Sequence, residues 1–280
     1  MSMDDESGDA RPPLPVVRAF ATGCDYSDLV PLEGGQSTVW RAGSVVLKPL
    51  DMPVEALQWQ ADLVRSMDTR RFRMAAPERA RDGRLVVDGW TAWPYLEGAH
   101  AIARWADIIA VGHLFHAAVS GCPRPDFLAA RRDRWAIGDR VAWGETRIDP
   151  YLDARHVADL AAHLRPVADR PQLVHADLTG NVLFHPTLPP AVIDVSPYWR
   201  PTPFASAVVV ADALVWEGAN ESLLQAVDGE PSMGQYLLRA LIFRLVADHP
   251  ARPQPADGRC LPDPYVRAVR LAIENAAQEV

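Results

Sequence analysis

The stretch that decides the fold reads VHADLTGNVLFHPTLPPAVIDV, from Val174 to Val195. Short apolar runs in it are each bounded by a polar residue: Asp177 follows the first run, Asn181 opens the second, and Asp194 ends the third. Phosphoryl transfer needs a base for the attacking hydroxyl and oxygen ligands for Mg²⁺, and two carboxylates and an amide supply both. The pattern therefore indicates a site for phosphoryl transfer.

This stretch resembles the catalytic region of the aminoglycoside phosphotransferase and choline kinase group of the protein-kinase-like fold. That group carries a His-x-Asp catalytic loop, a downstream Asn and an Ile-Asp metal motif. The resemblance implies that Asp177 accepts or orients the substrate hydroxyl proton, and that Asn181 and Asp194 hold Mg²⁺. It also implies a structural role for His175, which would support the loop through backbone hydrogen bonds.

Two features depart from the group's pattern. The group places its Asn five residues after the catalytic Asp, whereas Asn181 lies four residues after Asp177. Ala176 also stands where the group often has Gly. The shorter loop must turn at Gly180, which leaves room for altered substrates or for a protein that binds nucleotide with little turnover.

Lysine is almost absent from the chain: of 28 basic residues, Lys48 is the only lysine. Where Arg replaces Lys so widely, a retained lysine indicates a position that needs a compact ammonium. Lys48 ends an apolar run downstream of Gly34 and Gly35. This order resembles the glycine loop and strand lysine of kinases, which implies that Gly34, Gly35 and Lys48 bind the phosphates of ATP. A strand end with a solvated lysine is the alternative.

Residues 53–67 have the apolar spacing of a helix. In the group that the chain resembles, one carboxylate on this helix holds the lysine against the α- and β-phosphates. Asp62 is favoured because its distance along the chain from Lys48 is similar to the group's usual spacing. Glu55 stays open, either for the same role or as a first-turn acid favoured by the helix dipole.

The segment 93–98, which reads WPYLEG, ends a strand-rich stretch and opens a loop. By resemblance it is the hinge between two lobes, where backbone groups bind adenine. Pro94 lacks an N–H but keeps its carbonyl, which would accept from the adenine amino group while the Leu96 N–H donates to the ring. A plain strand-to-helix turn explains the same residues.

Beyond the hinge the spacing predicts helices over 101–119, 151–164, 202–216, 221–227, 233–248 and 264–277. His113 and His116 lie three apart on the first of these helices. Packed or half-exposed histidines are favoured over a metal pair there, because no acidic or Cys partner stands near in sequence. Asp212 lies in an almost wholly apolar helix and needs partners if it is buried. The related fold has an Asp that accepts from backbone N–H groups of the catalytic loop, and a place at the water-facing edge is the alternative.

The expected fold is therefore α+β and bilobal, protein-kinase-like, with a small antiparallel-sheet N-lobe, a mostly helical C-lobe and the nucleotide between them. Residues 1–15 are expected to form a flexible N-terminal tail. Residues 16–96 are expected to form the N-lobe, with a nucleotide-binding sheet and one helix. Residues 97–280 are expected to form the helical C-lobe, with the catalytic and metal-binding loops.

Composition excludes several other classes of protein. The net charge of −8 argues against a nucleic-acid partner, because phosphate backbones need a basic face. No apolar run reaches the roughly 18 residues of a membrane span. Three cysteines, Cys24, Cys122 and Cys260, are odd in number and far apart, which argues against disulfides or zinc and fits a reducing cytoplasm.

The expected reaction is transfer of the ATP γ-phosphoryl group to a hydroxyl of a small molecule (an aminoglycoside, an amino alcohol or a sugar), with ATP and Mg²⁺ as cofactors. A nucleotide-binding pseudokinase, a kinase of protein side chains and a scaffold without nucleotide are the alternatives. The residues after Asp194 lack the Phe-Gly that a protein kinase carries there, which speaks against that alternative. The sequence identifies neither the acceptor nor the oligomeric state.

Overall fold

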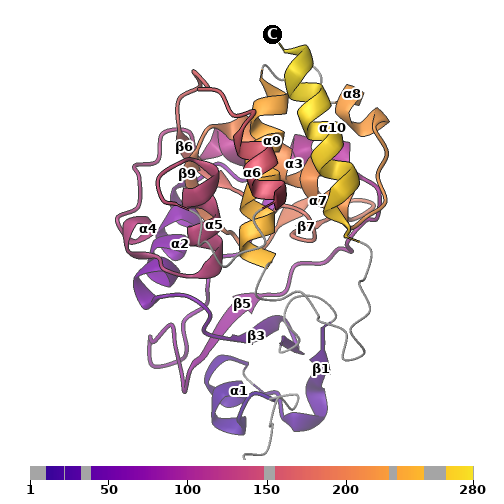
Figure 1. Ribbon diagram of the computed structural model, residues 1–280. Coiled ribbons are helices and arrows are strands. Elements are labelled where there is room, and N and C mark those ends of the chain that lie inside the picture. The colour runs from indigo at the N-terminus through magenta and orange to yellow at the C-terminus, as the bar shows by residue number, and fades with distance from the viewer. Residues whose placement is uncertain are drawn as a thin grey trace, which may run out of the picture. The chain divides into compact units, whose positions relative to one another are not determined.

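The computed structural model describes residues 11–21, 23–32, 39–147, 155–226, 232–248 and 263–279 (Figure 1). The chain divides into two units, residues 1–99 with 183–193 and residues 100–182 with 194–280. The first unit thus extends to residue 99, not 96, and it also includes the later segment 183–193. A division of the chain at one boundary does not include such a segment. Helix α1 (Leu14–Phe20) overlaps the end of the tail predicted over 1–15.

The first unit contains a four-stranded antiparallel sheet in the order β1-β2-β3-β5. Its strands are β1 (Leu29–Pro31), β2 (Trp40–Ala42), β3 (Val45–Pro49) and β5 (Trp90–Pro94). Between β2 and β3 the chain turns at Gly43, whose φ of +61° costs a glycine nothing sterically. Lys48 on β3 lies opposite Thr91 on β5, so the register of these two strands fixes the position of the Lys48 backbone.

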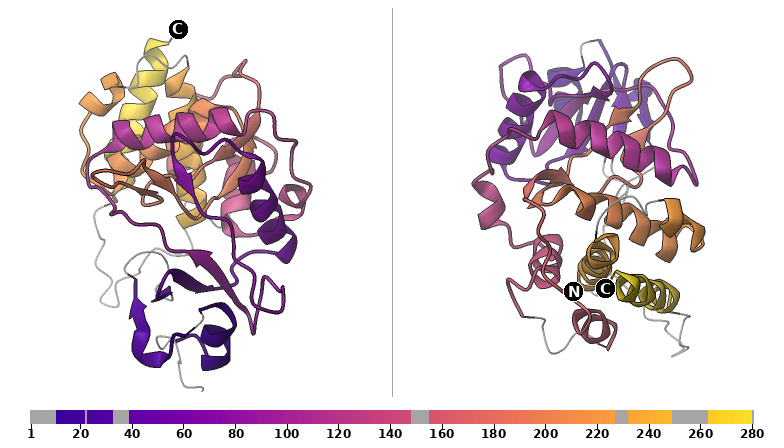
Figure 2. Two further views of the ribbon diagram at one scale, coloured as in Figure 1. Left: turned by 180° about the vertical axis from the view of Figure 1, so that it is seen from behind. Right: turned by 90° about the horizontal axis from the view of Figure 1, so that it is seen from above.

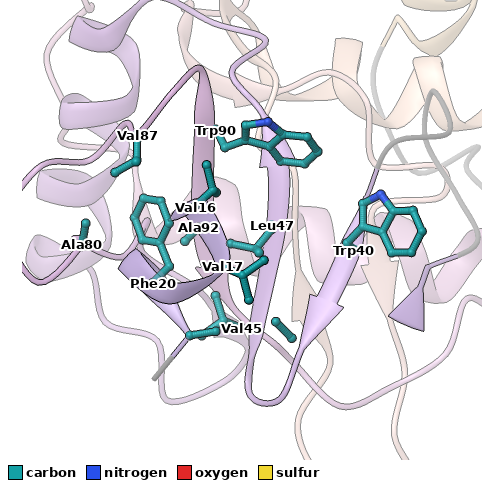
Figure 3. Packing of buried hydrophobic residues seen from close by; sticks show 12 residues of the cluster. Val16, Val17, Phe20, Trp40, Val45, Leu47, Ala80, Val87, Trp90 and Ala92 are labelled. Carbon is teal, nitrogen blue, oxygen red and sulfur yellow. The ribbon is translucent and has the colours of Figure 1, made fainter. Parts of the chain in front are cut away.

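The core of this unit lies between α1 and the sheet (Figure 3). Val45 and Leu47 are buried while Val46 between them is only half-buried, as expected for alternate residues of a strand with one covered face. Val16 and Val17 of α1 are fully buried against this face. The packing of α1 on this face therefore holds the backbone of β3, from which the Lys48 side chain extends.

Three further elements complete the first unit. Helix α2 (Val54–Ser66) follows β3, and the short strand β4 (Arg73–Met74) follows α2. Strand β8 (Ala191–Val192) pairs in parallel with β4. This pairing explains why the segment 183–193 belongs to the first unit although it lies between parts of the second.

The second unit is built around α9 (Met233–Asp248), which contacts α5 (Arg134–Ala142), α6 (Arg155–Ala161), α7 (Thr202–Val215) and α10 (Tyr265–Gln278). The right-hand view of Figure 2 looks nearly along α9, with α10 beside it. All residues of α9 from 233 to 247 are buried, including two arginines, Arg239 and Arg244. A helix buried on every side lies at the centre of a core, so its charged residues must have internal partners.

The remaining described elements of the second unit are α3 (Trp105–Ala118), α4 (Phe127–Ala130), α8 (Ser222–Ala226), β6 (Gln172–His175) and β9 (Pro197–Arg200), with β7 (Val182–Leu183) at its boundary. Strands β6 and β9 form an antiparallel ribbon in which His175 stands opposite Pro197. Across the described ranges, no helix combines the length and the apolar character that crossing a bilayer requires.

Candidate active site

The two acidic residues of the deciding stretch leave the same end of the β6–β9 ribbon. In an antiparallel pair the end of one strand lies beside the start of the other. Asp177 follows the last residue of β6 by two positions, and Asp194 precedes the first residue of β9 by three. The Ala176 N–H donates to the Ser196 carbonyl oxygen at 3.2 Å, which extends the pairing toward both acids. The ribbon therefore brings two segments far apart in sequence to one place.

His175 supports this end of the ribbon from inside. Its side chain is fully buried, and its Nδ1 accepts from the backbone N–H of Asp177 at 3.2 Å and of Ser196 at 3.4 Å. One ring nitrogen thus joins the loop that carries Asp177 to the loop that carries Asp194. The structural role expected of His175 is confirmed.

His116 of α3 lies behind His175 and accepts its backbone N–H on Nε2 at 3.2 Å. Burial, with repulsion from His175 and His113, lowers the pKa of His116 to about 3. His113 instead bonds the hydroxyl of Ser206 at 3.2 Å. His116 is thus a packed residue and His113 an exposed one, which agrees with the packed or half-exposed histidines favoured from the sequence. No cluster of three or more His, Cys, Asp or Glu fit to hold a metal occurs within the described part of the chain.

The side chain of Asn181 closes the short loop from Asp177 to Asn181. Asn181 Nδ2 donates to the backbone carbonyl of Asp177 at 2.6 Å and lies 3.3 Å from its carboxylate Oδ2. Gly180 takes φ +76°, the left-handed turn expected of it. Because Asn181 Nδ2 is bonded to Asp177 inside the loop, Asn181 Oδ1 is directed away from Asp177.

Asp194 is an exposed residue between the buried Val192 and Val195, and its φ is +47°. A non-glycine residue in this region carries backbone strain of about 1–3 kcal/mol and is frequent at ligand sites. An amide oxygen from Asn181 and a carboxylate from Asp194 are hard donors, which suits Mg²⁺. The donor set therefore fits the expected ion, which Asn181 and Asp194 would hold.

A residue that the sequence analysis missed contacts the predicted base. The Arg244 Nη2 atom donates to Asp177 Oδ1 at 2.7 Å, and the same guanidinium binds Asp212 through Nε at 2.7 Å and Nη2 at 2.6 Å. Asp212 was expected to accept backbone N–H groups of the catalytic loop or to face water. It instead pairs with a side chain, because its helix packs against α9, which carries the arginine.

Burial decides the charge states of this group. The side chains of Arg244 and Asp212 are only 4% and 5% exposed, whereas that of Asp177 is 40% exposed. Burial raises the pKa of Asp212 to about 6, with repulsion from Asp177 adding to the rise and Arg244 opposing it. The neighbouring carboxylates raise the pKa of Arg244 above its ordinary value despite burial, so the guanidinium is always charged.

Lys48 lies in the first unit and is buried, with 8% of its surface exposed, so the alternative of a solvated lysine is wrong. Its Nζ atom lies 3.4 Å from Asp51 Oδ2 and 5.4 Å from the ring centroid of Trp93. The hydroxyl of Thr91 donates to the Lys48 carbonyl at 3.1 Å. A buried ammonium is stable only with anionic or π partners, which makes this position suited to an anionic ligand.

Asp62 does not pair with Lys48 in the described structure. Its carboxylate is 56% exposed and accepts from Arg65 at 2.7 Å and from Gln58 at 3.2 and 3.1 Å. The reason is helical phase, because Asp62 lies on the solvent face with its neighbours three and four positions away. Glu55, the second candidate, is exposed as well. The buried polar residue of α2 is Gln60, which is 2% exposed and which sequence spacing did not single out.

The expected hinge follows the edge strand β5. The Tyr95 N–H donates to the Ser44 carbonyl at 2.8 Å, so the adjacent residues Val45 and Pro94 form a pair without mutual hydrogen bonds. The Pro94 carbonyl is therefore directed away from β3. The same alternation directs the Ala92 carbonyl outward, where it accepts from the Glu78 N–H at 2.7 Å. The Pro94 carbonyl therefore faces the open edge of the sheet.

Leu96 lies two residues beyond Pro94 in the loop after β5, and it is half-buried. Gly34 and Gly35, expected to cover the phosphates, lie outside the described residues.

An ion-pair network holds β9 against α5. Arg200 binds Asp139 through two hydrogen bonds of 2.9 and 2.7 Å and binds Glu145 at 2.6 Å. A cavity of about 60 Å³ beside these residues has room for only a few water molecules. The network therefore anchors the strand that follows Asp194 and does not form a pocket for a substrate.

No protein-family model and no curated protein matches the sequence at a significant level. Solved structures do match. Amicoumacin kinase hAmiN, in complex with AMP-PNP, Ca²⁺ and Ami, superposes with a TM-score of 0.61 at 15% identity, over 91% of this chain and 90% of its own. Spectinomycin phosphotransferase APH(9)-Ia, in complex with ADP and spectinomycin, gives 0.54 at 14% identity, over 95% and 98%.

Aminoglycoside phosphotransferase APH(4)-Ia gives a TM-score of 0.55 at 15% identity, over 91% of this chain and 94% of its own. The matches cover nearly the whole of each chain, so the likeness extends over both units and is not limited to one motif. At such low identity it establishes the fold alone. The chain therefore has the α+β, protein-kinase-like fold found in these small-molecule phosphotransferases.

Proposed function

We propose that this chain transfers the γ-phosphoryl group of ATP to a hydroxyl of a small molecule. The observation that carries the proposal is the convergence of Asp177 and Asp194 at one end of the β6–β9 ribbon, with Asn181 bonded to Asp177. A carboxylate base, an amide oxygen and a second carboxylate are the groups that this reaction requires. The shared fold supports the same conclusion.

In the proposed reaction, Asp177 Oδ2 accepts the proton of the acceptor hydroxyl. The acceptor oxygen forms a bond to the γ-phosphorus while the bond from that phosphorus to the bridging oxygen of ADP breaks. Asn181 and Asp194 would hold Mg²⁺, which would neutralise charge on the phosphates. Lys48 would bind the α- and β-phosphates, and its burial beside Trp93 keeps the ammonium in one place.

Adenine would bind at the open edge of β5, with the Pro94 carbonyl accepting from its amino group and the Leu96 N–H donating to the ring. Gly34 and Gly35 would cover the phosphates through backbone N–H groups. The Asp51 carboxylate, 3.4 Å from Lys48, would hold the ammonium until nucleotide binds. Asp51, just before α2, would thus hold the Lys48 ammonium in place of the carboxylate expected on α2.

The acceptor is proposed to be a hydroxylated small molecule of the aminoglycoside, amino alcohol or sugar type. The reaction is proposed to take place in the cytoplasm. The proposed type of acceptor follows from the fold and from the reaction, since the neighbours of known structure include a spectinomycin phosphotransferase and an amicoumacin kinase. Neither nucleic acid nor a membrane is proposed as a partner.

The test is an ADP-release screen across hydroxylated metabolites and antibiotics, with Asp177→Asn as the blank. Loss of a positioned base is expected to lower kcat by about 10²–10⁴-fold. The side chain is partly exposed and Asn keeps its shape, so the urea midpoint of unfolding should change little. Turnover of Asp177→Asn at the wild-type rate would refute the assignment.

A nucleotide-binding pseudokinase is the second candidate, favoured by the loop that is one residue shorter than the group's pattern. It predicts that Mg·ATP raises the melting temperature while no acceptor in the screen causes ADP release. Acceptor-dependent ADP release excludes it.

A further inference from the structure

Arg244 is the only described residue that contacts both the predicted base and a buried carboxylate of a neighbouring helix. It lies on α9, 67 residues after Asp177 in sequence. Asp212 on α7 accepts two hydrogen bonds from it, one to each carboxylate oxygen. The third hydrogen bond, at 2.7 Å, goes to Oδ1 of Asp177.

The guanidinium of Arg244 has little freedom to move. Its side chain is 4% exposed, and it lies 5.3 Å from the ring centroid of Trp135 and 5.1 Å from that of Phe243. Two parallel hydrogen bonds to Asp212 fix the plane of the guanidinium, because both groups are planar. The nitrogen that faces Asp177 is therefore held by two packed helices, α7 and α9.

We infer that Arg244 is a positioning residue that holds Oδ1 of Asp177 and leaves Oδ2 to receive the proton of the acceptor hydroxyl. The inference rests on the proposed function. Oδ2 lies 3.3 Å from the Asn181 amide, which limits rotation of the carboxylate from the other side. Asp212 takes part by fixing the arginine and does not contact the reacting atoms.

A purely structural ion pair would not need the third contact. Asp212 and Arg244 already form a neutral, doubly bonded pair in the core. The contact to Asp177 adds a partly exposed carboxylate and links the buried pair to the predicted base. Arg239 shows the contrast: it is also buried on α9, but its Nη1 donates to the Gln235 carbonyl at 2.9 Å and its Nη2 to the Arg165 carbonyl at 2.7 Å.

The experiment compares Arg244→Met/Asp212→Leu with Arg239→Met, using the acceptor found in the ADP-release screen. Removing both partners of the buried pair leaves no unpaired charge, so the double variant is expected to fold. Arg239→Met removes an arginine of the same helix that lacks any contact with Asp177. Arg244→Lys keeps the charge but lacks the fixed plane of hydrogen bonds.

The expected result is a fall in kcat of about 10²-fold for the double variant, since a small displacement of a reacting group has that effect. The KM for Mg·ATP should stay close to the wild-type value, because Arg244 acts on the base and not on nucleotide binding. Arg244→Lys should recover part of kcat. Arg239→Met should keep the wild-type kcat even where its melting temperature falls.

Three results would overturn the inference. They are a double variant with the wild-type kcat, a rise in KM that accounts for the whole loss, and an equal loss of kcat in Arg239→Met. Failure of the proposed function gives a different result: wild-type protein would then release no ADP with any acceptor, or Asp177→Asn would match the wild type.

Discussion

At the scale of single residues, His116 shows how burial sets a charge state. The ring is 3% exposed, and its Nε2 must stay unprotonated to accept the His175 N–H. Burial is the main cause that lowers its pKa from 6.5 to about 3. The native state therefore excludes a proton that the unfolded chain binds readily, which links the stability of this region to pH.

This linkage predicts an acid-sensitive contribution to stability. The folded pKa lies below the unfolded one, so the contribution is complete above pH 6.5 and is lost as the pH falls toward 3. At pH 5 the free energy of unfolding should be about 2 kcal/mol lower than at pH 8 on account of His116 alone. Urea unfolding of wild type and His116→Gln at both pH values measures it, since Gln places an uncharged acceptor near the position of Nε2.

The free energy of unfolding of His116→Gln should lack this part of the pH dependence. The difference in this free energy between wild type and His116→Gln should therefore be smaller at pH 5 than at pH 8. Asp212 acts in the opposite direction, because its pKa is raised to about 6 and favours the native state on acidification. Its contribution is present in both proteins and cancels in the comparison. If the free energy of unfolding depended on pH in the same way in both proteins, His116 would not be the source of the predicted loss of stability in acid.

Residues with local signals could be predicted from the sequence. His175 follows an apolar run and lies two residues before Asp177, and Lys48 is the one lysine of the chain. Arg244 could not be predicted, because it is one arginine among 27 and is distinguished only by its contact with Asp177 in the folded chain. Asp62 was chosen by its distance along the chain, but helical phase turns it to solvent.

At the scale of elements, α5 and α9 approach closely at Gly138. A Cβ added there would lie 2.6 Å from the backbone carbonyl oxygen of Phe243, the residue before Arg244. In an isolated helix Gly→Ala would stabilise by about 1 kcal/mol. Here overpacking should dominate, and Gly138→Ala is expected to destabilise by about 1–3 kcal/mol.

Because the displaced backbone is next to Arg244, Gly138→Ala should also lower kcat, whereas Gly121→Ala should not. An added Cβ on Gly121 meets no atom within 4 Å, which makes it the matched control. Thermal unfolding and ADP release of both variants test this. A stable and fully active Gly138→Ala would show that the two helices can move apart without effect on the site.

Elements with clear periodicity were predicted within a few residues. The helices α2, α7, α9 and α10 are examples. Helix α5 was not predicted, because its sequence RWAIGDRVA is mixed and contains the glycine that its packing requires. Helix α3 begins at Trp105 and not near residue 101, since Ala103 has φ +58°, which no right-handed helix accommodates.

At the scale of the whole molecule, the order of units along the chain is not simple. The stretch from Val174 to Val195 crosses from the second unit to the first at residue 183 and returns at 194. The parallel pairing of β4 with β8 causes this crossing. The fold class could be predicted from one motif, but the crossing could not, because two-residue strands leave too little pattern in the sequence.

Most of the proposed function depends on Asp177, Asn181 and Asp194 forming one site for a magnesium nucleotide at the end of the β6–β9 ribbon. The most direct measurement is a crystal structure of the complex with Mg²⁺ and AMP-PNP. The account predicts Mg²⁺ bound by the Asn181 amide oxygen and the Asp194 carboxylate, Lys48 Nζ on the α- and β-phosphates, and Asp177 Oδ2 facing the γ-phosphate. A nucleotide bound elsewhere, or one that leaves Lys48 and Asp194 without contact to it, would contradict the account.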